Sequence, residues 1–190
     1  MTNLIPTSKL LARKKMFSFM GDEFEILDPN GELKFFVKQK AFKLKEAITV
    51  SDHTKSNPVL FIKARSWMDF SGTYDVTDPS GQKFGALKRD GVSSMFRDKW
   101  IIFDAQDNAV GTVEEDSMLA AMIRRFLTNI IPQRYDITID GQLIAEFDQH
   151  FNPFIAKFDL DFTKNASGAL SPEMGIAIAV LLLAIEGRQN

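Results

Sequence analysis

The sequence predicts a mainly β protein: a closed antiparallel barrel of about twelve strands around a buried apolar C-terminal helix. Three observations support this fold class. Short runs alternate bulky apolar and polar residues, turn-forming residues follow these runs at regular intervals, and a long apolar run lies near the C-terminus. The chain of 190 residues has 17 phenylalanines and no cysteine. It can therefore bury one sizeable core, and it forms no disulfides.

The predicted strands share one pattern, in which two bulky apolar residues at alternate positions are followed by an aspartate. The pattern occurs at 24–28, 48–52, 74–78, 100–104 and 135–140. Proline and glycine follow two of these aspartates as four-residue turns, and Asp140-Gly141 is typical of a type I′ hairpin. Second strands are expected after each turn, at 33–38, 59–65, 83–89, 109–114 and 142–148, with further strands near 16–20 and 154–162.

The apolar run at 175–185 predicts a helix that is buried on every side. Ser171, Pro172 and Glu173 fit its N-cap, first residue and first-turn acid, and Gly187 fits its C-cap. The run would rise about 16 Å, too short for a hydrocarbon core of about 30 Å, so no transmembrane span is expected. A membrane anchor is the alternative. A sandwich core about 10 Å thick cannot enclose a helix, whereas a barrel lumen can.

Two further segments complete the expected organisation of a single domain over 1–190. Apolar residues recur at helical spacing over 116–131, which predicts an amphipathic helix that covers one end of the barrel. Residues 1–14 are expected to form a loose leader, with a membrane-touching arm as the alternative. The leader lacks the apolar region of a secretory signal, so we expect a cytoplasmic protein or one at the inner face of the membrane.

A basic surface is expected on the outside of the barrel. Strand parity turns Phe35, Val37 and Leu60 toward the lumen, so the basic residues between them face outward. The candidate lipid- or polyanion-binding residues are Lys34, Lys38, Lys40, Lys43, Lys45, Lys63 and Arg65. Anionic headgroups attract such a surface by about 1 kcal/mol per cation. An ordinary solvated face is the alternative.

Catalytic and metal-binding patterns are weak in this sequence. His53 falls in a turn, and His150 follows Asp148 at a spacing of two, which suggests a base with an orienting acid. No nucleophile motif or glycine-rich phosphate loop accompanies this pair. We therefore expect a protein that is not an enzyme and that uses no cofactor and no metal.

These features resemble the Tubby C-terminal-like superfamily, and most closely its LURP-one-related and phospholipid scramblase-like members. The resemblance extends from about Lys15 to Gly187. It rests on Phe24-x-Ile26-x-Asp28-x-x-Gly31, on VKQKAFKL at 37–44, and on Tyr74-x-Val76 followed by Gly81. It implies a twelve-stranded barrel around a central C-terminal helix. It also implies phosphoinositide binding through a basic barrel face, as in Tubby domains, and membrane association, as in scramblase-like proteins.

Two departures limit what the resemblance implies. Scramblase members have an acidic calcium-binding segment before the last helix, but residues 163–171 here contain no carboxylate, so calcium-driven activity is not expected. Without cysteine, palmitoyl anchors are impossible. The expected function is a membrane-associated module of the scramblase-like kind that binds anionic phospholipid or phosphoinositide. A protein-interaction scaffold without ligand is the alternative. Nucleic-acid binding is third, because the aromatic residues near the basic face have core parity.

Overall fold

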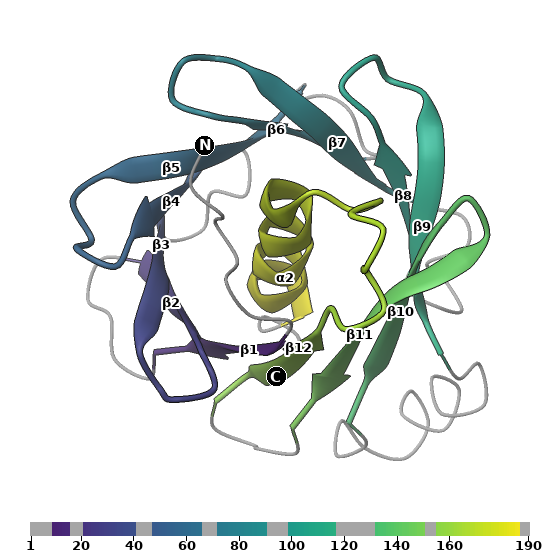
Figure 1. Cartoon of the computed structure of the whole chain (residues 1–190). Coiled ribbons are helices and arrows are strands. Elements are labelled where there is room, and N and C mark those ends of the chain that lie inside the picture. The colour runs from purple at the N-terminus through teal and green to yellow at the C-terminus, as the bar shows by residue number, and fades with distance from the viewer. Residues whose placement is uncertain are drawn as a thin grey trace.

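Antiparallel strands surround one helix in the computed structural model, which describes residues 9–15, 21–40, 47–65, 72–90, 99–116, 132–150 and 155–186 (Figure 1). The strands in this part of the chain are β1 (Lys9–Lys14), β2 (Gly21–Leu27), β3 (Leu33–Lys40), β4 (Ile48–Asp52), β5 (Pro58–Ala64), β6 (Thr73–Thr77), β7 (Lys83–Arg89), β8 (Lys99–Phe103), β9 (Ala109–Glu115), β10 (Arg134–Ile139), β11 (Gln142–Gln149) and β12 (Lys157–Asp161). The helix is α2 (Pro172–Glu186). The predicted fold class, a closed barrel around a C-terminal helix, is confirmed.

Each strand pairs with its neighbours in the chain, and β1 pairs with both β2 and β12 to close the barrel. Closure leaves none of the described strands with an unpaired edge. The expectation of a loose leader is wrong for residues 9–14, which form β1 in register with β12. The sequence of β1 shows little alternation, because the apolar Leu11 separates the buried Leu10 and Ala12 and the other three residues are charged.

Three sequence expectations fall outside the described residues. They are the strand near 16–20, the helix at 116–131 beyond its first residue, and the C-cap at Gly187.

The aspartate turns share one hydrogen-bond pattern at one end of the barrel. Asp78 Oδ1 accepts from the backbone N–H groups of Ser80 (2.8 Å) and Gln82 (2.9 Å). The turns after Asp28 and Asp104 repeat this pattern at the same spacings. Asp140 and Gly141 both have positive φ, 49° and 75°, as a type I′ hairpin requires. Asp28, Asp78 and Asp104 are therefore structural acceptors, as predicted, and so is Asp52, which accepts from Thr54 and Asn57.

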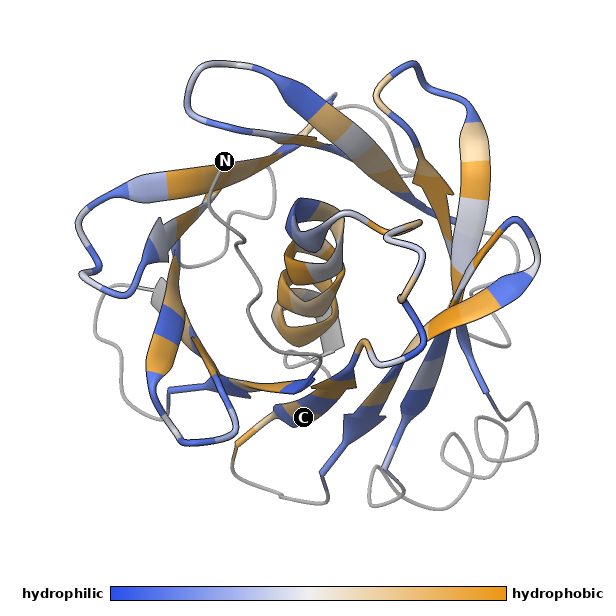
Figure 2. Ribbon diagram, viewed as in Figure 1, coloured by the Kyte–Doolittle hydropathy of each residue, from blue (hydrophilic) through white to orange (hydrophobic). Residues whose placement is uncertain are grey.

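The lumen is filled by inward side chains from the strands and by α2. Alternate residues such as Phe24, Ile26, Ile62 and Ile137 have no exposed surface. Figure 2 shows the turns in blue at the rim and α2 mostly in orange at the centre. The core therefore lies between the barrel wall and the helix, and polar residues between the inward ones face outward.

Helix α2 begins as the sequence predicts. Ser171 Oγ accepts from the backbone N–H of Met174 at 3.3 Å, which is the expected N-cap bond. All residues from Met174 to Ala184 are buried, and Leu181, Leu182 and Leu183 are at most 2% exposed. A Cβ at Gly175 would lie 2.8 Å from the ring of Phe162, which directly follows β12, so any larger residue would have to push this ring aside. The enclosed helix is thus confirmed.

Candidate functional site

The outer wall of β3 and β5 presents basic residues as strand parity predicts. Val37 is fully buried, and the next residue, Lys38, is exposed. Lys38 is in register with Thr49 on β4, which is in register with Phe61 on β5. Lys63 follows Phe61 by two positions and is also exposed on this wall. Since neighbouring strands lie about 4.8 Å apart and two residues extend about 7 Å along a strand, the two lysines start roughly 12 Å apart on the sheet.

Lys34 lies on the same wall, but carboxylates of the β2–β3 turn hold its ammonium group. Its Nζ is 3.0 Å from Asp28 Oδ2 and 3.0 Å from Glu32 Oε2. Hydrogen bonds to Glu32 and Asp28 raise the pKa of Lys34. The charge of Lys34 is therefore balanced by the two carboxylates beside it, and it adds little to the attraction of a distant anion.

Arg65, which follows β5 directly, is the centre of an ion-pair network. Its Nη2 is 2.6 Å from Asp75 Oδ1 and 2.7 Å from Asp107 Oδ1. Lys83 Nζ approaches the same two oxygens at 3.4 and 2.7 Å. The hydrogen bond from Arg65 lowers the pKa of Asp75, against the opposing effect of burial. Two cations and two carboxylates thus balance one another.

Strand β7 contributes a cation that sequence reasoning missed. Lys88 follows the inward Leu87, and its backbone is in register with Thr73 on β6 and Ile101 on β8. The alternation along 83–89 is the sequence signal that predicts its outward side chain. Within the described part of the chain, Lys38, Lys63 and Lys88 make no ion pair or side-chain hydrogen bond.

We call the outer face of β3 to β7 the basic wall. Its cations are Lys34, Lys38, Lys63, Arg65, Lys83 and Lys88. Among the described residues its strands contain two carboxylates, Asp75 and Asp52, and Asp52 ends β4, where it accepts hydrogen bonds from Thr54 and Asn57. Lys40 ends β3, but its side chain is not described. Lys43 and Lys45 lie outside the described residues, so their contribution stays a prediction.

Two aromatic side chains of the basic wall, Phe36 and the half-buried Phe61, face outward, which corrects the expectation that the aromatic residues there have core parity, and Phe36 is nevertheless covered. Phe36 is 8% exposed, and Lys55 Nζ and Lys15 Nζ lie 5.0 and 5.9 Å from its ring centroid. Glu25 holds Lys55 in this position, because its Oε1 lies 3.9 Å from Lys55 Nζ while its Oε2 pairs with Arg13 Nη2 at 2.7 Å. The ring is therefore occupied by cation–π contacts and is not available to stack on a base.

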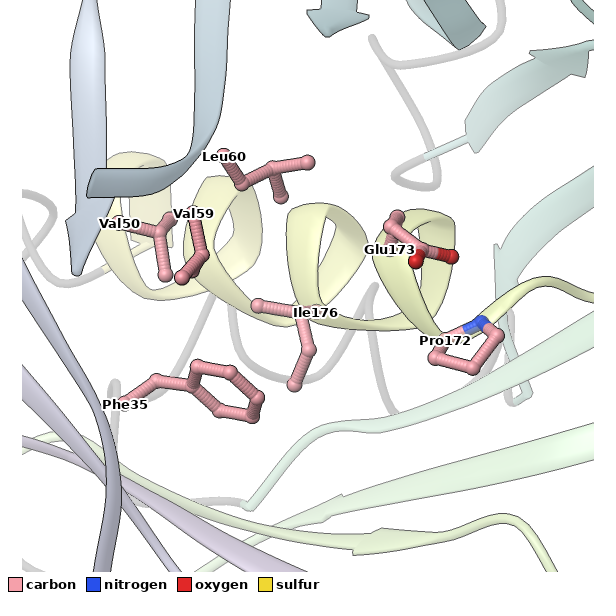
Figure 3. A pocket seen from close by; sticks show the side chains of 7 residues that line it. All are labelled: Phe35, Val50, Val59, Leu60, Pro172, Glu173 and Ile176. Carbon is pink, nitrogen blue, oxygen red and sulfur yellow. The ribbon is translucent and has the colours of Figure 1, made fainter. Parts of the chain in front are cut away.

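A small apolar pocket lies between the basic wall and the start of α2. Phe35, Val50, Val59, Leu60, Pro172, Glu173 and Ile176 line it (Figure 3). Its cavity volume is about 10 Å³, room for no more than one water. This pocket is too small to bind a metabolite, so the outer wall is the stronger candidate site.

Comparisons with known proteins agree with this architecture. A model of the LURP-one-related family matches residues 33–182, which is more than half of the chain. The chain belongs to the LURP-one-related family. Its barrel is similar to an X-ray structure of a protein from Arabidopsis thaliana, with a TM-score of 0.52 and 14% identity, covering 96% of this chain and 92% of that one. This likeness shows the fold alone. No curated protein matches the sequence.

The acid that the sequence associated with His150 is not its partner in this LURP-one-related barrel. His150 Nε2 lies 2.7 Å from Asp159 Oδ2 on β12, and the two side chains are 45% and 60% exposed. Asp148 is instead 3.6 Å from Arg134 Nε. Residues two apart in a strand lie about 7 Å from one another, whereas pairing with β12 brings Asp159 alongside. His53 is exposed in the β4–β5 turn, as expected.

The segment compared with the scramblase calcium site is a loop between β12 and α2 in this LURP-one-related protein. Asn165 shapes it by donating to Leu170 O at 2.7 Å and accepting from Leu170 N at 3.1 Å. Among the described residues, no three His, Asp or Glu side chains are grouped so that they could hold a metal ion. Nor does that part of the chain contain a helix with the length and apolar content needed to cross a bilayer.

Proposed function

We propose that this LURP-one-related protein is a non-enzymatic, peripheral membrane module that binds anionic phospholipid, phosphoinositides included, through the basic wall at the cytoplasmic face of a membrane. One observation supports this most strongly. Lys38, Lys63 and Lys88 project from alternate strands of one wall, and they have no anionic partner among the described residues. Such cations are available to phosphate headgroups, unlike Lys34 and Arg65.

The expected strength of this attraction is modest. At about 1 kcal/mol per cation, three lysines contribute roughly 3 kcal/mol, which is about a hundredfold in partition. The interaction must also depend on salt, since the Debye length falls from about 30 Å at 0.01 M to about 8 Å at 0.15 M. Weak, salt-sensitive binding is typical of a reversible peripheral protein.

The experiment is co-flotation with vesicles of phosphatidylcholine alone, with 30% phosphatidylserine, or with a phosphoinositide added. We expect flotation only with the anionic vesicles, and a steep loss as salt rises. Lys63→Glu should weaken binding roughly thirtyfold, because it changes the charge by two units at about 1 kcal/mol each. The melting temperature of Lys63→Glu should fall by no more than a few degrees, because the new carboxylate lies opposite Asp75, which Arg65 and Lys83 already balance.

A matched control lies on the far side of the barrel. Lys157 on β12 also faces outward and makes no ion pair within the described residues. Lys157→Glu makes the same change in net charge, and binding should change less than about threefold if the basic wall is the site. Equal losses from the two variants would exclude the basic wall. If wild-type protein ignores every anionic vesicle, the scaffold function becomes the better hypothesis.

A further inference from the structure

A continuous row of carboxylates crosses the wall formed by β9 to β12. Glu114 on β9 is in register with Asp136 on β10. Asp136 is in register with Glu146 on β11, and Glu146 with Asp161 on β12. Like charges directly opposite one another destabilise a sheet. Four neighbouring strands therefore share an arrangement that opposes folding and that needs cations to hold it together.

Several cations supply this compensation. Arg134 lies between strands β9 and β11 and contacts Glu146, and Lys164 Nζ reaches Glu146 Oε2 at 2.5 Å. From the flanking strands, Lys99 pairs with Glu114 at 2.9 Å, and Lys9 pairs with Asp161 at 3.2 Å. These contacts keep the row in place. The same face also has carboxylates outside this row, which add to its negative charge.

A second pair of carboxylates gives this face more negative than positive charges. Asp148 and Asp159 are in register, and their side chains are 53% and 60% exposed. We call the outer face of β9 to β12 the acidic wall. Its strands present six carboxylates among the described residues: Glu114, Asp136, Glu146, Asp148, Asp159 and Asp161. Two cations, Arg134 and Lys157, project from the same described strands.

The acidic wall and the basic wall lie on opposite sides of the barrel (Figure 1). In the closed strand order, β4 and β10 are six strands apart in either direction. The lumen between them holds a helix about 10 Å wide in addition to the side chains packed around it. The separation therefore exceeds the Debye length of about 8 Å at physiological salt, so a charged surface interacts with each wall separately.

We propose that the barrel docks on its side, with the basic wall against the anionic bilayer and the acidic wall turned away from it. This inference rests on the proposed lipid-binding function. The acidic wall is the repulsive element that excludes the other side-on orientations, and the basic wall is the attractive one. The like-charge row, which opposes folding, thereby contributes to a single docked orientation.

Two threonines allow a matched test of this orientation. Thr49 on β4 and Thr138 on β10 are half-buried, face outward and lie on opposite walls. The natural chain has no cysteine, so Thr49→Cys and Thr138→Cys each introduce one labelling site. A fluorophore on each is measured on vesicles with 30% phosphatidylserine and a headgroup-level quenching lipid. The label at 49 should lose most of its emission, and the label at 138 should lose almost none.

Equal quenching of the two labels would overturn side-on docking in favour of end-on docking or free tumbling. Thr138 shares a hydrogen bond with Thr112 (Oγ1 to Oγ1, 3.0 Å). If Thr138→Cys lowers the melting temperature, Asp159→Cys places the label at an exposed position on the same wall. Flotation of each labelled protein is measured in parallel. If nothing floats, lipid binding fails and side-on docking fails with it, whereas flotation with equal quenching rejects the orientation alone.

A charge reversal tests the repulsive element itself. Asp148→Lys together with Asp159→Lys, made in the Thr138→Cys chain, gives the acidic wall a cationic patch. We expect tighter partition to the same vesicles and strong quenching of the label at 138. Asn at both positions is the control that removes the carboxylates without adding cations, and it should give intermediate quenching. If the lysine variant remains folded but leaves the label at 138 unquenched, the acidic wall does not set the orientation.

Discussion

Arg65 Nη2 lies 2.7 Å from Asp107 Oδ1, although 42 positions separate the two residues in the chain. Asp107 has a φ of 67°, in the left-handed region, within the β8–β9 turn. The same carboxylate oxygen receives a hydrogen bond from Lys83 at 2.7 Å. The guanidinium therefore joins the end of β5 to a turn from another hairpin. Its charge stabilises the contact between these two segments.

This arrangement predicts that Arg65 and its neighbour Lys63 have separable roles. Arg65→Gln should lower the free energy of unfolding by about 1 kcal/mol, since exposed ion pairs contribute up to about that much, and should change vesicle binding little. Lys63→Gln should leave stability unchanged and weaken binding to anionic vesicles about fivefold. Thermal melts and co-flotation of the two variants measure both effects. The same loss of binding from both would show that Arg65 also belongs to the lipid site.

The cost of Arg65→Gln should depend on pH through Asp75. The hydrogen bond from Arg65 lowers the pKa of Asp75 in the folded protein. The ionised Asp75 therefore stabilises the fold at any pH above its ordinary pKa of 3.8. It is lost as the pH falls through the lowered folded pKa. The melting temperatures of wild type and variant should therefore converge below about pH 3.8. A constant difference down to pH 2.5 would contradict this origin.

The repeated turn aspartates predict a second acid sensitivity. A hydrogen bond from the Ser80 side chain, with further bonds from the Gln82, Ser80 and Gly81 backbone, lowers the pKa of Asp78. Asp104 is shifted in the same direction, first by the side chain of Asn108. Both carboxylates stabilise the fold when the pH is above 3.8, their ordinary pKa. They lose this effect as the pH falls through their lowered pKa values in the folded protein.

Substitutions at Asp78 test this at neutral pH. Asp78→Asn keeps an amide oxygen that can accept both backbone N–H groups, whereas Asp78→Ala keeps none. The melting temperature should therefore fall in the order Asp, Asn, Ala, and the Asn variant should lose less stability than wild type on acidification. Calorimetric melts between pH 3 and 7 provide the measurement. Indistinguishable Asn and Ala variants would mean that the turn holds its shape without this acceptor.

A third prediction concerns the lumen. Gln39 is 1% exposed, and among the residues that the structure describes neither Nε2 nor Oε1 of its amide has a hydrogen-bond partner. A buried polar group without a partner costs about 1–3 kcal/mol. Gln39→Leu or Gln39→Met should therefore raise the free energy of unfolding by about that amount, as measured by urea titration with an unchanged slope. A destabilised Gln39→Met variant would indicate that water satisfies the amide in solution.

Much of the fold could be predicted because its patterns are local. Alternation in runs such as Phe24 to Asp28 specifies which side chains face inward, and the apolar run of α2 requires an enclosing wall. The strand β1 could not be found this way, because Leu10 and Ala12 give it too little alternation. Its pairing with β12 depends on closure of the whole barrel, which is a property of residues about 150 positions apart.

The candidate site was predictable only in part for a similar reason. Parity tells which way a lysine points, and it placed Lys38 and Lys63 outward correctly. It cannot tell which acid lies nearby when that acid comes from another hairpin, as Asp107 does for Arg65. The pairing of His150 with Asp159 likewise required the register of β11 with β12.

The position of α2 after every strand has a consequence for the time at which the protein can fold. Strand β1 is closed by β12, and the core they enclose is completed only by residues 172–186. At about 5–20 residues per second, the ribosome takes on the order of ten seconds or more to add the residues between these elements. During that time the inward faces of the strands have no helix to pack on. Chaperones that shield such faces should therefore associate with the nascent chain until the helix has emerged.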